Sequence, residues 1–331
     1  MPSYPKTRLR RPRQSEFSRR LVRESHLSTD DLIWTMIVSD SVKGREKVES
    51  LPGVERVDID NLVKDAKRAE ALGIPAIALF PHISPSLKDA IGTEALNPDG
   101  LIPNAIKAVK SAVPDLGVIV DVALDPFTDH GHDGVMVGDE IINDITVDAL
   151  ADGAVILADA GADIVAPSDM MDGRVGAIRN ELDQFGHHNM MIMSYAAKYA
   201  SGFYGPYRDA IGTSSALRGD KRTYQMDPGN TNEAIREVRM DLDEGADMIM
   251  VKPGLPYLDI ICRLKSELGV PTFAFQVSGE CAMIMAAAEN GWIDEKRVIL
   301  ESLMSFKRAG CDGILTYFAP KAATWLLENK V

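Results

Sequence analysis

The chain has 331 residues, of which 45% are hydrophobic and 26% are charged, as is typical of a globular protein. Its net charge of −13 argues against nucleic acid as the main partner. No stretch of about 18 apolar residues occurs and the N-terminus lacks the apolar segment of a signal peptide, so we expect a cytoplasmic protein without a membrane span. The length suits two domains or one α/β barrel with extensions.

The charge is unevenly distributed along the chain. Residues 1–25 contain eight Lys or Arg and two Glu, so they carry +6 and the remainder carries −13 − 6 = −19. A basic segment on an acidic protein predicts an N-terminal arm, residues 1–30, that lies against another copy of the chain; a solvated tail is the alternative. Cys262, Cys281 and Cys311 are an odd number without paired spacing, which disfavours disulfides and fits a reducing compartment.

Eight apolar runs predict strands, and segments with helical periodicity follow them. We expect strands at residues 32–40, 74–80, 117–124, 163–169, 190–200, 247–251, 271–279 and 312–319. We expect helices at residues 61–73, 104–113, 147–161, 174–185, 232–246 and 256–269, in two stretches up to residue 310, and at 322–330. The alternation predicts a TIM (β/α)8 barrel over residues 31–331. A doubly wound sheet is less favoured because no Gly-rich nucleotide-binding turn follows the first strand.

Polar residues gather where the predicted strands end. In a barrel these carboxyl ends line the active-site face. The residues found there are Asp121, Asp125, Ser168, Asp169, Lys198, Lys252, Ser278 and Tyr317. Such a collection is too polar to fill a core, so it marks a candidate site.

Two of these residues are lysines at the ends of neighbouring strands. Lys252 follows four residues of buried-strand character, and desolvation there lowers the pKa of the amine and makes the free base available to attack a ketone. A second amine nearby, Lys198, lowers at least one pKa further by repulsion. The pair predicts a Schiff-base enzyme. The alternatives are a lysine that reaches solvent from a strand end, or one that only pairs with a carboxylate such as Asp169.

Two further stretches carry candidate groups. Residues 201–230 follow the Lys198 strand and contain four cations among Gly, Ser and Tyr, which predicts a lid that binds carboxylates; an exposed basic loop is the alternative. Residues 121–134 contain His130 and His132 with flanking aspartates. That pattern alone is a weak metal signal, and a set without thiolates favours a harder ion than zinc, or no ion.

Four motifs together closely resemble the porphobilinogen synthase (5-aminolevulinate dehydratase) family, and the similarity runs over nearly the whole chain. They are GADMIMVKPGLPY at 245–257, MSYAAKYASGFYGPYRDA at 193–210, APSDMMDGRVGAIR at 166–179 and FQVSGE at 275–280. The resemblance implies a TIM barrel whose N-terminal arm wraps a neighbouring subunit, usually in an octamer. It also implies condensation of two 5-aminolevulinate molecules to porphobilinogen with loss of two waters, a step of tetrapyrrole synthesis.

The resemblance also implies roles for individual residues. Lys252 would form the imine with the substrate that becomes the acetate side, and Lys198 the imine with the one that becomes the propionate side. One substrate carboxylate would be bound by Arg208 and Lys221. The remaining expected substrate contacts are Gln225 in the lid, Ser278 and Tyr317 at the other carboxylate, and Ser168.

The metal-binding positions depart from one branch of this family. Zinc-dependent members carry three cysteines in the stretch 121–134, where this chain has Ala123, Asp125 and Asp133. Ala123 has no donor atom, so a thiolate zinc site cannot form, and the chain resembles the aspartate-rich branch without catalytic zinc. Asp121, Asp125 and Asp133 are then candidates for proton relay or for positioning water or an ion. The family's allosteric magnesium carboxylate corresponds to Glu237, and magnesium suits an all-oxygen shell.

Two other functions stay open at this point. A class I aldolase-type lyase needs only one imine lysine, with Lys198 as an auxiliary. A non-catalytic barrel that serves as a scaffold or binding subunit is the alternative from another class, and it gives no reason to keep both lysines.

Overall fold

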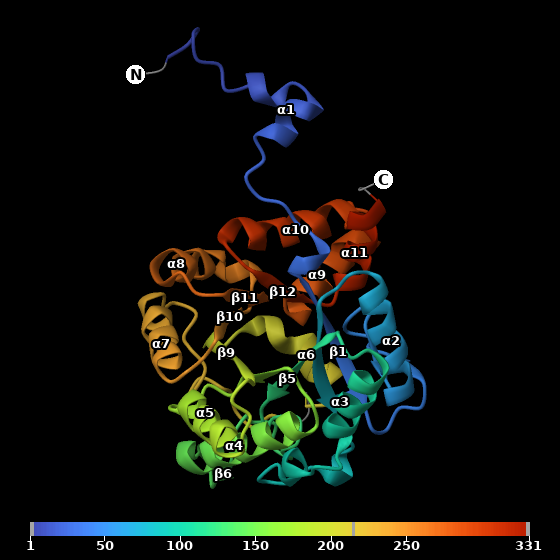
Figure 1. Ribbon diagram of the computed structural model, residues 1–331, viewed down its shortest axis with the longest axis vertical. Helices are drawn as coiled ribbons and strands as arrows, with labels where there is room; N and C mark the ends of the chain where they lie inside the picture. The colour runs from blue at the N-terminus through green and yellow to red at the C-terminus, as the bar shows by residue number, and fades with distance from the viewer. Residues whose placement is uncertain (1–2, 214–215, 329–331) are drawn as a thin grey trace.

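The computed structural model describes residues 3–213 and 216–328, and within them eight parallel strands form a closed barrel (Figure 1). Closure follows from the pairing of the last strand with the first, where Leu32 lies opposite Ile314. The barrel strands are β1 (Leu32–Ser39), β4 (Ala76–His82), β5 (Gly117–Val122), β8 (Ile164–Pro167), β9 (Met191–Lys198), β10 (Met248–Lys252), β11 (Thr272–Phe275) and β12 (Gly313–Thr316). The predicted TIM barrel is confirmed.

Helices surround the barrel (Figure 1). Each buries a stripe of apolar residues against the strands; in α2, Leu62, Ala66 and Ala69 recur at a spacing of three to four and are fully buried. The helices are α2 (Ile59–Ala71), α3 (Leu101–Ala112), α4 (Asn143–Asp159), α5 (Arg174–Gln184), α6 (Gly205–Ala210), α7 (Asn232–Asp243), α8 (Leu258–Leu268), α9 (Ser278–Glu289), α10 (Glu295–Ala309) and α11 (Ala319–Glu328). No helix in the described part of the chain is long and apolar enough to cross a membrane.

Several strands end earlier than the sequence predicts. Strand β8 covers only part of the expected 163–169, and β12 only part of 312–319, because Ala319 already begins α11. The prediction that Ser278 ends the seventh strand is wrong, since β11 stops at Phe275 and Ser278 is the first residue of α9. In each case the buried apolar run continues from the strand into the next turn, so hydropathy alone does not mark the boundary. Of the last predicted helix, residues 329–330 lie outside the described residues.

One barrel-edge element was not predicted. Strands β2 (Arg45–Lys47) and β3 (Glu55–Val57) form an antiparallel hairpin between β1 and α2, and β3 pairs with the end of β1. Their short, charged sequences lack the apolar alternation that indicates a strand. A second small hairpin, β6 (Met136–Val137) and β7 (Glu140–Ile141), follows the carboxyl end of β5.

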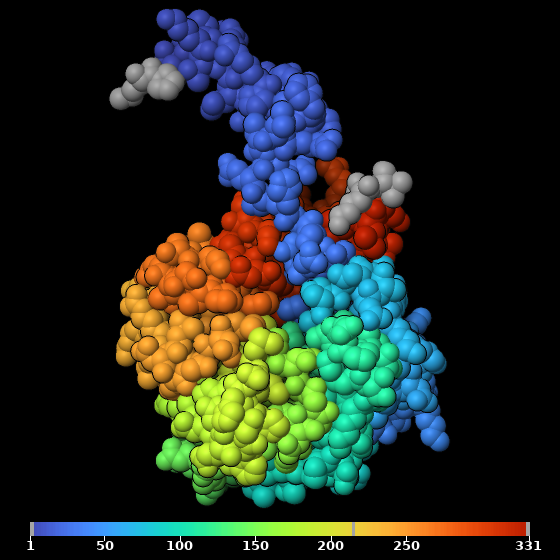
Figure 2. All heavy atoms as spheres, in the orientation of Figure 1, coloured from blue at the N-terminus to red at the C-terminus, as the bar shows by residue number. Residues whose placement is uncertain are grey.

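The N-terminal segment extends away from the barrel (Figures 1 and 2). It contains the short helix α1 (Glu16–Leu21), which buries none of its residues. Phe17 and Leu21 of this helix are 67% and 79% exposed. The described part of the predicted arm, residues 3–30, therefore presents apolar side chains with no cover from its own chain, and residues 1–2 lie outside the described residues.

Candidate active site

Two buried lysines lie side by side at the carboxyl end of the barrel. Lys198 is the last residue of β9 and Lys252 the last of β10, and the two are direct partners in the register of these parallel strands. Only 5% of Lys198 and 4% of Lys252 is exposed. Two amines that close in a buried place cannot both hold a proton without cost.

Lys252 has an aromatic environment. Its Nζ lies 4.7 Å from the ring centre of Phe275, and 5.0 to 5.5 Å from the rings of Tyr195, Tyr204 and Tyr207. No hydrogen bond or ion pair joins this nitrogen to another of the described residues. Burial, and after it the charge of Lys198, lowers the pKa of Lys252 to about 7. The free amine is therefore abundant at neutral pH.

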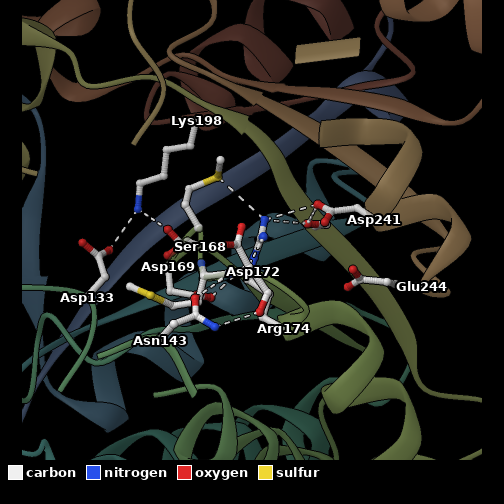
Figure 3. A network of polar contacts seen from close by, with 12 residues as sticks. Asp133, Asn143, Ser168, Asp169, Asp172, Arg174, Lys198, Asp241 and Glu244 are labelled. Atoms are coloured by element: carbon white, nitrogen blue, oxygen red, sulfur yellow. Dashed lines mark hydrogen bonds and ion pairs between the residues drawn. The ribbon is translucent and has the colours of Figure 1, made fainter. Parts of the chain in front are cut away.

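Lys198 is held by acceptors. Its Nζ donates to Asp133 Oδ1 at 3.0 Å and to the carbonyl of Ser168 at the end of β8 (Figure 3). Lys198 thus does pair with a carboxylate, but with Asp133 and not with Asp169, whose Oδ1 accepts from the Met171 backbone at 2.6 Å and whose other oxygen faces Arg174. The two lysines thus differ: Lys252 is surrounded by rings, whereas Lys198 is fixed by a carboxylate.

A third lysine, Lys221, bridges two aspartates. Its Nζ lies 3.2 Å from Asp125 Oδ2 and 2.6 Å from Asp133 Oδ2, and Tyr224 also donates to Asp133 at 3.0 Å. Burial opposes ionisation of Asp133, but the charges of Lys198 and Lys221 outweigh it, so the pKa of Asp133 lies well below its usual range. Burial likewise opposes the charge on Lys221, yet both carboxylates raise the pKa of this lysine. These ions hold one another in their charged forms.

Asp121 behaves differently. It lies on β5, and its Oδ1 is buried without a hydrogen-bond partner among the described residues. Burial raises its pKa, the charge of Lys252 opposes the rise, and the result is a pKa of about 7. A carboxyl group with this pKa can accept or release a proton at neutral pH.

The lysines line a narrow cavity of about 20 Å³. Its walls are formed by Asp125, Lys198, Tyr204, Tyr207, Arg208, Lys221, Gln225 and Lys252. This volume holds about one water molecule. Five of the walls come from residues 201–230, so this segment forms much of the boundary of the cavity. Residues 214–215 of the segment lie outside the described residues.

Ser278 and Tyr317 contact aromatic residues that surround Lys252. Ser278 is fully buried at the start of α9, where its Oγ accepts from the Tyr207 backbone at 2.8 Å. The ring of Tyr317 packs 6.2 Å from that of Phe275, and its buried hydroxyl has no partner among the described residues. Two hydroxyl groups that can still donate are available there for an acceptor such as a carboxylate.

Glu280 was missed by the sequence reasoning. It is fully buried and accepts from three backbone N–H groups, those of Gly254 at 3.2 Å, Leu255 at 2.7 Å and Val277 at 2.7 Å. Burial raises its pKa to about 7 although these hydrogen bonds oppose the rise. Glu280 thus joins the turn after Lys252 to the start of the Ser278 helix. The sequence feature that could have indicated this contact is a glutamate at the third position of a helix, where the carboxylate accepts a hydrogen bond from the backbone N–H that precedes the helix.

The two histidines are occupied by structural contacts. His130 Nε2 lies 3.1 Å from the Ala90 carbonyl, and His132 contacts the Tyr224 hydroxyl at 2.9 Å and the Arg218 carbonyl at 2.6 Å. Within residues 3–213 and 216–328, no three His, Cys, Asp or Glu side chains are grouped so that they could hold a metal ion directly. The His132 ring therefore anchors this loop to the segment 201–230, whereas the His130 ring contacts the backbone at Ala90.

Glu237 lies apart from the lysines, on α7. It belongs to an acidic cluster around the buried Arg174, whose guanidinium lies 3.2 Å from Asp241 and 3.7 Å from both Glu237 and Asp169. Figure 3 shows Arg174 between Asp241 and the side that carries Ser168 and Lys198. Burial raises the pKa of Glu237. Glu237 also borders an open pocket of about 520 Å³, whose other oxygen-bearing walls include Asp139, Glu140, Asn143, Asp172 and Glu233. The donors are all oxygen and widely spaced, which suits a cation that keeps its water shell.

Comparisons with known proteins agree on one family. The family model described as delta-aminolevulinic acid dehydratase matches residues 6–325. The chain is 59% identical over 316 residues to the delta-aminolevulinic acid dehydratase of Bradyrhizobium diazoefficiens, covering 96% of this chain and 90% of the relative, and 51% identical to that of Rhodobacter capsulatus, covering 97% of each. It also resembles the enzyme of Toxoplasma gondii ME49 solved with the product porphobilinogen, with a TM-score of 0.96, 48% identity, and coverage of 98% of this chain and 92% of that one.

Proposed function

The chain belongs to the delta-aminolevulinic acid dehydratase family, and we propose that it condenses two molecules of 5-aminolevulinate to porphobilinogen through Schiff bases on two lysines. The overall reaction releases two waters and is a step of tetrapyrrole biosynthesis. The observation that carries the proposal is the register pairing of Lys198 and Lys252 at the carboxyl end of the barrel, with the pKa of Lys252 lowered to about 7.

Lys252 is the first candidate for imine formation. About half of its amine is neutral at pH 7, whereas an amine with the ordinary pKa of 10.5 is neutral in roughly one molecule in 3,000. The neutral nitrogen attacks the substrate ketone, and loss of water gives the imine. Protonation of that imine makes the adjacent carbon more acidic, which permits the new C–C bond. Asp121, with its pKa of about 7, is the candidate to accept that proton.

Lys198 holds the other substrate in this proposal. A second imine beside the first tethers both ketones and makes a bimolecular condensation effectively intramolecular. Lys198 donates to Asp133, and this carboxylate, held in its charged form, keeps the amine in place beside Lys252. After the amino group of one substrate closes the ring, each lysine is released as a free amine for the next cycle.

Charged and hydroxyl groups on two sides of the lysines are the proposed carboxylate contacts. Arg208, Lys221 and Gln225 form walls of the cavity from the segment 201–230, which we propose is the lid. Ser278 and the Tyr317 hydroxyl, which has no hydrogen-bond partner among the described residues, are proposed to bind the other carboxylate. Ser168 contributes through its backbone, because its carbonyl accepts from Lys198.

We propose that the site works without catalytic zinc, as in the aspartate-rich branch of the family. Ala123 offers no ligand, and Asp125 and Asp133 both point at the ammonium group of Lys221. A lysine thus supplies the positive charge between these carboxylates, and Asp125 and Asp133 are assigned to proton relay and positioning. Their donor set does not fit zinc, which favours thiolate and imidazole ligands in tetrahedral geometry.

Magnesium is proposed to act at a distance, at Glu237. The pocket beside this carboxylate, which also has apolar walls and Arg222, carries enough carboxylates to favour a hydrated Mg²⁺ with one protein ligand. A bound divalent cation would keep Glu237 ionised and would compete with Arg174 for this carboxylate. Arg174 also faces Asp169, which is next to Ser168. The role is therefore allosteric in this proposal.

The assembly is also part of the proposal. The exposed apolar residues of α1 and the positive charge of residues 1–25 support an arm, residues 1–30, that packs against a second copy of the acidic barrel domain, residues 31–331. We propose a homo-octamer located in the cytoplasm.

Formation of pyrrole product from 5-aminolevulinate tests the proposed function. Purified protein is incubated with the substrate, and porphobilinogen is measured with an Ehrlich-type colour reagent. We expect activity in the wild type and in Lys67→Met, which changes an exposed lysine on α2, and none in Lys252→Met. A wild-type protein without pyrrole product, over a range of magnesium concentrations, would favour a non-catalytic barrel.

A further inference from the structure

The β2–β3 hairpin holds the end of the helix that carries Arg208. From β3, Arg56 donates through Nε to the Ala210 carbonyl at 2.7 Å and through Nη2 to the Asp209 carbonyl at 2.7 Å. From the loop between the strands, Ser50 donates to the Asp209 carboxylate at 2.5 Å. Both contacts join residues more than 150 positions apart, so they connect the hairpin that follows β1 to the segment 201–230.

The geometry of Arg56 suits the end of a helix. Asp209 and Ala210 are the last residues of α6, where carbonyls lack the partners of a helix interior; the Asp209 carbonyl accepts from the Gly212 backbone at 3.1 Å and has room for a second donor. A planar guanidinium can bond two of them at once, and its charge faces the negative end of the helix. Glu46, opposite Arg56 in the hairpin, pairs with its remaining nitrogen and fixes the orientation of the side chain.

Helix α6 is held by the packing of the buried Tyr207, whose ring lies 5.7 Å from that of Phe80, and by contacts at both of its ends. It has only six residues, and its other end is fixed by the Ser278 hydroxyl, which accepts from the Tyr207 backbone. Tyr207 and Arg208, in the middle of α6, both line the lysine cavity. A six-residue helix is unstable alone, so contacts at its two ends determine where these side chains lie.

The turn after α6 is packed against the barrel as well. Gly212 has a φ of +72°, and a side chain there would lie 3.2 Å from the ring of His82 at the end of β4. The glycine thus lets the turn lie close to His82, and Arg56 holds the two residues that precede Ile211 and this glycine. The position of Arg208 is fixed between these contacts.

We propose that Arg56 is a positioning residue for the reaction: it holds α6 so that Arg208 and Tyr207 face the lysine cavity. The inference rests on the proposed function, in which Arg208 binds a substrate carboxylate. Arg56 itself touches neither the cavity nor its lysines. Its influence on substrate is exerted through Arg208.

The hairpin offers a matched control. Arg45, on β2, binds Asp65 at 2.8 and 2.9 Å and Glu55 at 3.2 Å, and it makes no hydrogen bond to α6 within the described residues. Arg45→Ala and Arg56→Ala therefore both remove an arginine with ion pairs from one hairpin, but only Arg56→Ala releases the helix. Arg56→Lys keeps the charge and can bond one carbonyl only.

Steady-state kinetics give the first test. We expect Arg56→Ala to raise KM for 5-aminolevulinate about tenfold with kcat lowered less, Arg56→Lys to lie between it and the wild type, and Arg45→Ala to stay within about twofold of the wild type. In a double-mutant cycle, Arg56→Ala should add less than about twofold to Arg208→Ala. A full tenfold effect of Arg56→Ala on the Arg208→Ala background would overturn the proposal.

Hydrogen–deuterium exchange measures the positioning without any turnover. The amides of Ile211, Gly212 and Thr213 bond back to residues 207–209, and they should exchange at least several-fold faster in Arg56→Ala than in the wild type or in Arg45→Ala. Unchanged exchange would show that Arg56 does not hold α6. If exchange changes in a protein that makes no pyrrole, the proposed function fails and the holding role of Arg56 survives.

Discussion

Replacing Lys252 by methionine should abolish activity and yet stabilise the fold. The lysine is buried among four rings, and its pKa falls from 10.5 to about 7, which corresponds to about 4–5 kcal/mol against the charged form. Methionine has a similar length, carries no charge and packs well on aromatic rings. Part of the gain is lost because the Lys252 charge also favours ionisation of Asp121. We expect the free energy of unfolding at pH 7 to rise by roughly 1–4 kcal/mol.

The lowered pKa of Lys252 also sets the direction in which stability changes with pH. The folded pKa lies below the unfolded one, so between about pH 7 and 10.5 the unfolded chain binds more protons at this position and the wild type gains stability as the pH rises. The advantage of Lys252→Met should therefore be greatest at or below pH 7 and fall by about half at pH 9. Guanidinium denaturation at fixed protein concentration measures it, and Lys67→Met, on the exposed face of α2, should stay within about 0.5 kcal/mol of the wild type. A Lys252→Met protein less stable than the wild type at pH 7, or an advantage that does not shrink by pH 9, would refute the reasoning.

Further predictions concern the metal and Glu280. After EDTA treatment, magnesium should restore or stimulate activity, and Glu237→Ala should keep basal turnover but lose this stimulation. Rescue by zinc alone would contradict a site without catalytic zinc. An unchanged magnesium response in Glu237→Ala would contradict the magnesium site at Glu237. Glu280→Gln turns an amide N–H₂ group toward backbone donors, so we expect about 1–3 kcal/mol lower stability by denaturation and at least a tenfold lower kcat. A variant with wild-type kcat would mean that the carboxylate does not fix the Lys252 turn.

The barrel and the two lysines were predictable because their signals are local. Each strand is an apolar run, and in a parallel barrel the residue at the end of each run lies at the carboxyl end of the barrel. Lys198 and Lys252 could therefore be placed at the ends of neighbouring strands from the sequence alone. Ser278 was placed at the correct end of the barrel but on the wrong element. Buried residues continue past Phe275, and the helix starts there because the Glu280 carboxylate bonds to Val277.

The contacts between distant segments could not be read from the sequence. Nothing near Lys198 or Lys221 indicates that both bind Asp133 rather than Asp169, because those pairs depend on how a loop after β5 folds over the barrel. The histidines gave only a weak metal signal, and the sequence did not show that their ring nitrogens contact Ala90, Arg218 and Tyr224. The β2–β3 hairpin lacks apolar alternation, since its strands are only three residues long and mostly charged.

Trapping of the imines tests the central claim most directly. The protein is mixed with labelled 5-aminolevulinate and sodium borohydride, which reduces an imine to a stable secondary amine, and the labelled peptides are identified by mass spectrometry. We predict label on Lys252 and on Lys198, and none on the exposed Lys67. Label on only one of the two would favour an aldolase-type mechanism with a single imine. Label on neither Lys252 nor Lys198, in a protein that still forms porphobilinogen, would contradict the account.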